Sequence, residues 1–186
     1  MGGIIIIKKI FLFVLLFIIV VPNAFAIDTD DVDYYQQNPD TGYAVVIDDE
    51  ANLLKDEEIG KLSDEMFSLT KYGNIVFLTK DNSSLSSQKI AHDYYYNLFN
   101  TDSGTVILIN MRERVVYIHS DGENYKSITD DKALSITNNI YRELKNKNYY
   151  VGAKKAFSQI QRILMRTIYN RRANAAYSKR FSVIFN

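Results

Sequence analysis

Residues 102–121, DSGTVILINMRERVVYIHSD, decide the fold that the sequence predicts. Two runs rich in β-branched and other apolar residues flank a short polar turn, a pattern typical of a β-hairpin. If Arg112 and Glu113 form the turn, the pairing of the two strands places Gly104 opposite Asp121. The stretch therefore predicts two antiparallel strands whose open end carries carboxylates and glycines.

Helices and strands on either side of this hairpin complete the predicted domain. Upstream, apolar residues at helical spacing predict helices over residues 55–72 and about 90–99, each following a short strand. Downstream, two further helices are expected, the first capped by Ser127 or Thr129 and the second starting near Val151. The two upstream strands are expected at residues 43–47 and 75–79.

The predicted order of elements is β-α-β-α-β-β-α-α. Strands separated by helices favour parallel pairing through right-handed crossovers, whereas the last strand returns as the antiparallel partner in the hairpin. The predicted fold class is therefore α/β, a three-layer α/β/α domain on a small mixed sheet.

The N-terminus has the pattern of a secretory signal peptide. Lys8 and Lys9 precede an apolar run over residues 10–21, and Ala24 and Ala26 occupy the small-residue positions before a cleavage site. We expect an exported, extracytoplasmic protein, secreted or held at the outer face of the cytoplasmic membrane. The alternative is a retained N-terminal anchor, although the run is short for a bilayer span, which needs roughly 20 residues.

The chain divides into four segments on these patterns. An acidic segment with Pro39 and Gly42 separates the signal from the first strand and is interpreted as a linker. A cationic segment follows the last apolar stripe. The predicted segments are residues 1–26 (signal peptide), 27–42 (acidic linker), 43–170 (α/β domain) and 171–186 (basic C-terminal tail).

Composition excludes several kinds of site. The chain has no cysteine, which rules out a disulfide framework, a thiol nucleophile and a cysteine-ligated zinc.

The formal net charge of +0 hides an asymmetry between the two halves of the chain. Acids dominate residues 28–65, whereas Glu143 is the sole acid from Arg142 onward. Such asymmetry indicates an anionic partner for the C-terminal end.

Several short motifs follow one another in a fixed order. They are Val46-Ile47-Asp48 with Leu53-Leu54, Asp102-Ser103-Gly104 at the start of a strand, the arginines at the turn, Asp121-Gly122, Ile128-Thr129-Asp130 at the start of a helix, and Tyr149 to Gly152. In this order the motifs resemble the TPM domain family over about residues 43–165. That family includes thylakoid-lumen photosystem II repair proteins, an animal acetylcholine-receptor auxiliary subunit and many bacterial exported proteins.

The resemblance implies an extracytoplasmic domain tied to the maintenance of membrane complexes, with phosphatase activity ascribed to plant members and with cation binding. Two features depart from the family pattern. One glycine of the Gly-x-Gly that commonly follows the hairpin is replaced in the segment from His119 to Glu123. In addition, the apolar residues at 181–185 are too few to form the C-terminal membrane span found in many bacterial members.

Four aspartates are candidate metal ligands. Asp102, Asp121 and Asp130 cluster if the hairpin register is right, because a helix starts shortly after the strand that ends at Asp121. Their oxygens suit a hard cation such as Ca²⁺. Structural roles also fit, since Asp102 favours a turn and Asp130 a helix N-terminus. Asp48 is kept as a candidate through the family resemblance, and it belongs to the opposite edge if its strand is parallel to the next two.

Five basic residues form a candidate contact with an anionic surface. Lys155, Arg162 and Arg166 line one flank of the last predicted helix, and Arg171 and Arg172 follow. Such charges usually form a solvated face, but the lack of balancing acids favours contact with a membrane surface or with an acidic membrane-protein partner. Nucleic acid is not expected as a partner of an exported chain without interleaved exposed aromatic residues.

The sequence thus predicts an exported, membrane-proximal TPM-type binding or accessory domain, cation-dependent if Ca²⁺ binds. The alternative is a metal-assisted phosphomonoesterase at the acidic sheet edge, where the ion polarises a phosphoryl oxygen. No catalytic residue is identified. His92 and His119 have no second histidine at ligand spacing and are interpreted as structural, and the chain has no Gly-x-Ser-x-Gly motif.

Overall fold

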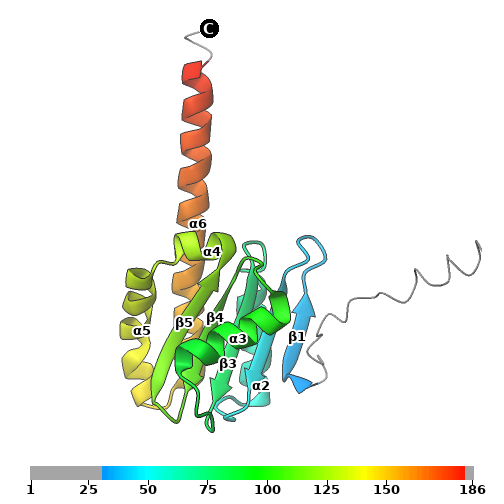
Figure 1. The fold of residues 1–186 in the computed structure, drawn as a ribbon, viewed down its shortest axis with the longest axis vertical. Helices are drawn as coiled ribbons and strands as arrows, with labels where there is room; N and C mark the ends of the chain where they lie inside the picture. Colours follow the sequence, from blue (N-terminus) through cyan, green and yellow to red (C-terminus); the bar gives the residue numbers. More distant parts are fainter. Residues whose placement is uncertain (1–30, 183–186) are drawn as a thin grey trace, which may run out of the picture.

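A five-stranded mixed sheet organises residues 31–182, the part of the chain that the computed structural model describes. The strand order is β1-β2-β3-β4-β5, with β2, β3 and β4 parallel and the two edge strands antiparallel (Figure 1). The strands are β1 (Tyr34–Gln37), β2 (Ala44–Asp49), β3 (Asn74–Lys80), β4 (Gly104–Asn110) and β5 (Val115–Asp121). The helices are α2 (Asp56–Phe67), α3 (Ser87–Phe99), α4 (Gly122–Ser127), α5 (Asp130–Lys145) and α6 (Tyr149–Ser182).

The hairpin has the register that the sequence predicts. Gly104 pairs with Asp121 at its open end, and Asn110 pairs with Val115 next to the turn. The turn is centred on Arg112 and Glu113. Strand β4 is buried along its whole length, whereas β5 is an edge strand and is partly exposed. The open end of the hairpin therefore lies where β4 begins and β5 ends.

Apolar cores on both faces of the sheet confirm the three-layer α/β/α class. Successive side chains of a strand point to opposite faces, so Val45 and Ile47 belong to one core and Val46 to the other. Helices α2, α5 and α6 cover the first face, where Phe77 packs edge-on against Phe157 with 6.5 Å between ring centroids. Helix α3 covers the opposite face.

The prediction of right-handed crossovers is wrong for one of the two connections. Both connections move in the same direction across the sheet, from β2 to β3 and from β3 to β4. Helices α2 and α3 nevertheless lie on opposite faces (Figure 1). Two β-α-β connections that step in the same direction across a sheet have the same handedness only if their helices lie on the same face. Since α2 and α3 lie on opposite faces, one of the two crossovers is left-handed. This arrangement covers both faces of the parallel strands, which are apolar on both sides.

Strand β1 corrects the interpretation of residues 27–42 as a linker. Tyr34 pairs with Ile47 and Gln37 with Ala44, which adds an antiparallel strand to the edge of the sheet. Most side chains of β1 are exposed, so the strand needs no apolar alternation and gives no periodic signal in the sequence. The pairing with β2 holds this strand through its backbone. Residues 27–30 lie outside the described part.

Helix α6 corrects the predicted boundary between domain and tail at residue 170. The helix runs unbroken from Tyr149 to Ser182, since no glycine or proline interrupts it after Gly152. Its first half packs on the sheet, and its second half projects past the end of the sheet that carries α4 (Figure 1). Within residues 31–182, no helix combines the length and apolar character needed to cross a membrane. The predicted signal peptide and residues 183–186 lie outside the described residues.

Candidate functional site

The Asp-Ser-Gly motif closes the open end of the hairpin. The main-chain carbonyl of Asp102 accepts a hydrogen bond from the hydroxyl of Tyr95 in α3, with 2.8 Å between the oxygens. The Ser103 hydroxyl oxygen accepts from the backbone N–H of Glu123 at 2.6 Å, and the Ser103 carbonyl accepts from the N–H of Asn74 at 2.8 Å. One short segment thus connects α3, α4 and the start of β3. We call residues 102–104 together with Asp121 and Gly122 the hairpin edge.

Both glycines of the hairpin edge are required by close approach. A Cβ on Gly104 would overlap the Tyr95 hydroxyl and the carbonyl oxygen of Asn74. Gly122 has a φ of +56°, in the left-handed region, and a Cβ there would lie 2.6 Å from the Ser103 hydroxyl oxygen. These positions fix the turn from β5 into α4, a short helix that the sequence analysis did not predict.

The three aspartates predicted to cluster at this edge have separate structural roles. Asp121 accepts a hydrogen bond from the N–H of Gly122 at 2.7 Å and caps α4, while Asp130 starts α5 in the position that favours a negative charge. Asp102 is exposed. Among residues 31–182, no group of three or more carboxylates or imidazoles lies close enough to hold a metal ion. The donor set as placed does not fit a three-carboxylate site, and calcium binding stays a prediction.

Asp48 lies at the other end of the sheet, as expected for a strand parallel to β3 and β4. Its carboxylate is 3.9 Å from the Lys80 ammonium, which also pairs with Glu50. Burial raises the pKa of Asp48 above its ordinary value, and the charge of Lys80 opposes that rise. Nearby, the Tyr94 hydroxyl is buried without a hydrogen-bond partner among the described residues. This end therefore combines a partly buried carboxylate with a buried phenol and the Lys80 ammonium.

Asp49, which sequence reasoning missed, has a structural role. Its two carboxylate oxygens accept from the N–H of Leu54 at 2.7 Å and from the hydroxyl of Thr79 at 2.6 Å. The side chain is 4 % exposed. The signal was available, because Asp49 continues the alternation of Val45 and Ile47 two residues beyond the predicted strand. A buried carboxylate at that position needs hydrogen-bond donors, which Leu54 in the loop into α2 and Thr79 in β3 supply.

The two histidines lie together on the face covered by α3, where His92 is exposed and His119 is half-buried. The rings of His92 and His119 are 5.5 Å apart, and the ring of Tyr95 lies 5.9 Å from that of His119. Burial lowers the pKa of His119 below its ordinary value, with a further lowering by His92 that Asp121 opposes. Nε2 of His119 is buried without a partner among the described residues. No carboxylate–imidazole–hydroxyl chain is formed by hydrogen bonds at this cluster in residues 31–182.

The predicted anionic-surface contacts separate into two groups on α6. Arg171 lies on the side of the helix that faces the domain and pairs with Glu123 at 2.6 Å, and Lys155 pairs with Glu143 at 3.4 Å. Arg162, Arg166 and Arg172 are exposed and have no carboxylate partner within residues 31–182.

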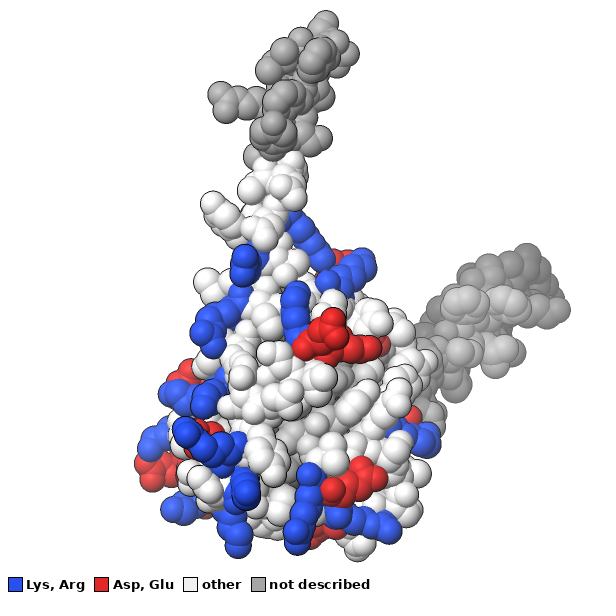
Figure 2. Space-filling view, turned by 90° about the vertical axis from the view of Figure 1, so that its left-hand side faces the viewer, with Lys and Arg blue, Asp and Glu red and all other residues white. Residues whose placement is uncertain are grey.

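At 3.6 residues per turn, Lys155, Arg162 and Arg166 share one face, opposite the buried stripe of the helix. We call these three residues the outer face of α6. Figure 2 shows Lys and Arg side chains over the side of the molecule that carries α5 and around the base of the projecting helix, with some acids between them. The outer face of α6 is thus a cationic surface that the fold leaves exposed.

Comparisons with known proteins agree with this fold. An NMR structure of BA42 protein from the psychrophilic bacterium Bizionia argentinensis is similar, with a TM-score of 0.53 and 20% sequence identity over 61% of this chain and 82% of that chain. At that identity the likeness shows the fold alone. A search of curated proteins found no match. A family model described as the TPM domain matches residues 47–163, nearly the range of the predicted resemblance. The chain therefore belongs to the TPM domain family.

Proposed function

We propose that this protein is an exported accessory domain that works at a membrane surface and contacts anionic lipid through the outer face of α6. One observation carries the proposal. Arg162 and Arg166 lie exposed on the face of α6 that points away from the core, next to a helical segment that projects past the sheet, and neither has a carboxylate partner among residues 31–182.

The physical argument rests on two neighbouring arginines, Arg162 and Arg166, that have no carboxylate partner among residues 31–182 and lie on a rigid element. A lysine or arginine near an anionic membrane contributes about 1 kcal/mol to binding, so a few engaged side chains give measurable affinity. Helix α6 is anchored by buried residues such as Phe157 and Ile160, and this anchoring fixes the position of the outer face relative to the domain. The helix backbone that carries the cations therefore does not have to be ordered on binding, which lowers the entropic cost.

The sequence of the N-terminus supports the extracytoplasmic part of the proposal. Lys8 and Lys9, the apolar run and the Ala24-Phe25-Ala26 site fit export by the secretory route. N-terminal sequencing of protein recovered from cells should give Ile27 as the first residue. A chain still starting at Met1 in the membrane fraction would instead make the N-terminal segment an anchor.

Vesicle co-sedimentation tests the surface contact. The protein from residue 27 onward should sediment with vesicles that contain phosphatidylglycerol, should not sediment with phosphatidylcholine vesicles, and should be released as salt rises. The Debye length falls from about 10 Å at 0.1 M to about 3 Å at 1 M salt, which screens exposed charges. Release only by truncation after Asn170 would move the contact to the projecting segment. No preference for anionic vesicles at low salt would leave an acidic protein partner as the reason for the charge asymmetry.

Calcium dependence belongs to the proposal as a separate part. A ligand that binds only the folded state stabilises it by RT ln(1 + [L]/Kd), so bound Ca²⁺ should raise the melting temperature. Replacing Asp102 and Asp121 together by asparagine should abolish that rise while the helix content stays the same. A calcium response that persists in this double variant places any ion elsewhere.

The metal-assisted phosphomonoesterase remains the alternative function. The sequence predicts its site at the hairpin edge, but we place the alternative at the opposite end of the sheet, because the aspartates of the hairpin edge do not gather into a metal site in residues 31–182. Asp48, Lys80 and Asn110 follow one another at the carboxyl ends of three parallel strands, the end at which ligands of open α/β sheets commonly bind. Hydrolysis of p-nitrophenyl phosphate by the purified protein, with and without Mg²⁺ or Ca²⁺, tests this alternative. Metal-dependent turnover that Asp48→Asn abolishes would favour the enzyme over the accessory domain.

A further inference from the structure

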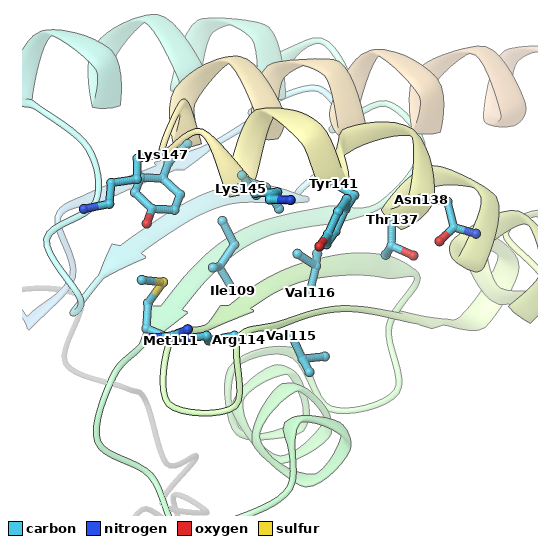
Figure 3. A pocket seen from close by; sticks show the side chains of 12 residues that line it. Ile109, Met111, Arg114, Val115, Val116, Thr137, Asn138, Tyr141, Lys145 and Lys147 are labelled. Atoms are coloured by element: carbon cyan, nitrogen blue, oxygen red, sulfur yellow. The ribbon is translucent and has the colours of Figure 1, made fainter.

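A groove of about 730 Å³ lies between the turn end of the β4–β5 hairpin and the C-terminal half of α5 (Figure 3). Apolar side chains from both elements line it, among them Ile109, Val116 and Tyr141. Tyr141 is 64 % exposed, and together with Ile109 and Val116 it forms a continuous apolar lining. The groove therefore offers a surface that an apolar ligand would remove from water.

One end of the groove is cationic. Arg114, Lys145 and Lys147 lie at the end formed by the hairpin turn and the last turn of α5 (Figure 3). All three side chains are exposed, and none is within 4.0 Å of a carboxylate in the described part of the chain. A ligand that carries a negative charge at this end would therefore find three unpaired positive charges.

Two of these residues occupy backbone positions that favour glycine. Arg114 has a φ of 55° and Lys147 a φ of 60°, both in the left-handed region. Lys147 follows the C-cap of α5, where glycine or asparagine is the usual residue. A side chain other than glycine or asparagine costs about 1–2 kcal/mol in this conformation. The chain places long cationic side chains at the mouth of the groove in spite of that cost.

The groove also reaches one end of a free sheet edge, at Val115 and Val116 of β5. Strand β5 pairs with β4 on one side, and on its other side no strand of residues 31–182 pairs with it. Val115, the first residue of β5, is 42 % exposed and lines the groove. A free edge strand presents unpaired N–H and C=O groups to which an extended segment can bind as an added strand.

We propose that this groove binds an extended segment of a partner protein, which adds as a strand to the free edge of β5. Apolar side chains of the segment fill the space between Val116 and Tyr141. A carboxylate of the segment lies at the cationic end formed by Arg114, Lys145 and Lys147. The free backbone edge of β5 is the reason to expect an extended conformation of the bound segment. The apolar lining of the groove is the reason to expect apolar side chains in the segment, and the unpaired cations are the reason to expect an acidic group.

This inference goes beyond the proposed membrane contact, since it concerns a different surface and a different class of partner. The groove is formed by the β4–β5 hairpin and α5, whereas the outer face of α6 consists of Lys155, Arg162 and Arg166. Variants with substitutions at residues that line the groove should therefore bind anionic vesicles as the wild type does. Failure of either proposal leaves the other standing.

Selection from a phage-displayed library of random dodecapeptides on the purified protein tests the groove. Enriched sequences should alternate apolar and other residues and contain at least one aspartate or glutamate. A synthetic copy of an enriched peptide should bind the double variant Arg114→Gly/Lys147→Gly at least tenfold more weakly, by fluorescence anisotropy. The same variant should melt no lower than the wild type, because glycine relieves the positive φ at both positions. Weaker binding then does not reflect unfolding.

Matched controls separate charge from backbone effects. Asn100→Gly changes another exposed residue with a φ of 55°, far from the groove in sequence and not part of its lining, and should leave peptide binding unchanged. N-methylation of alternate peptide amides should abolish binding if the peptide adds to β5 as a strand. The proposal is overturned if no sequence is enriched, if the enriched sequences lack acids, or if the double variant binds normally. Concentration-dependent dimerisation lost in the double variant would also overturn it, since a second copy would then be the occupant.

Discussion

The hairpin edge and the outer face of α6 differ in how the fold uses their charged and polar groups. At the hairpin edge, Ser103 and Asp121 are engaged in hydrogen bonds to backbone groups, and Gly104 has no room for a side chain. On the outer face of α6, Arg162 and Arg166 contact solvent and no carboxylate of residues 31–182. The first region holds the domain together, and the second is free to bind.

The difference shows that a family motif can record architecture instead of chemistry. Asp102-Ser103-Gly104 and Asp121-Gly122 carry much of the resemblance to the TPM family, and in the structure they connect β4, β5, α3 and α4. The cations of α6 belong to no motif. Substitutions should therefore affect stability at the hairpin edge and binding, without a change in stability, on the outer face of α6.

The largest expected effect is that of Gly104→Val. Its side chain would overlap the Tyr95 hydroxyl and the backbone of Asn74, so the variant should lose about 3 kcal/mol or more of unfolding free energy. Urea denaturation measures this loss. Gly60→Ala is the matched control, because nothing lies within 4 Å of the added methyl group in the middle of α2. That change should stabilise the protein by about 0.5–1 kcal/mol.

A smaller loss is expected for Ser103→Ala. The variant removes the oxygen that accepts from the N–H of Glu123, and the loss should be about 1–2 kcal/mol. Arg166→Ala on the outer face of α6 should change stability by less than about 0.5 kcal/mol, as surface substitutions usually do. Equal losses in the two variants would remove the distinction between the two regions.

The smallest expected effect is a pH dependence that originates next to the hairpin edge. Burial lowers the pKa of His119 in the folded state below its ordinary value of 6.5, so the unfolded state takes up the proton first. The stability contributed by His119 is therefore present above pH 6.5 and is lost as the pH falls through the folded-state pKa. The melting temperature of the wild type should therefore fall relative to that of His119→Phe as the pH drops from neutral through 6.5. A relative rise over the same range would contradict the sign.

Much of the fold follows from patterns visible in the sequence. The register of Gly104 with Asp121 follows from two strands of defined length around a short turn, and the buried stripe through Phe157 follows from helical spacing. Strand β1 and the hand of one crossover could not be predicted, because an exposed edge strand gives no alternation and the choice of face depends on which core each helix completes. The position of Asp49 was readable from alternation with Ile47, but its donors, such as Thr79, lie far along the chain.

The candidate site could be predicted only in part. The cations at 155, 162 and 166 share a face, as helical spacing predicts. The pairing of Arg171 with Glu123 depends on the position of α4, a short helix without a sequence signal. The groove beside α5 depends on the distance between a helix and an edge strand, which no local pattern encodes. The contacts between side chains of different helices and strands were therefore the part of the site that required the structure.

One measurement tests the central claim most directly: binding of Arg162→Glu/Arg166→Glu and of Arg171→Gln to phosphatidylglycerol vesicles at low salt, together with the melting temperature of each variant. Reversal of two outer-face charges should reduce binding by more than tenfold, since each basic side chain contributes about 1 kcal/mol, and should leave the melting temperature unchanged. Arg171→Gln, whose side chain is engaged with Glu123 in the wild type, should bind nearly as well as the wild type. Wild-type binding by the double reversal would contradict the account, because the outer face of α6 would then not be the contact.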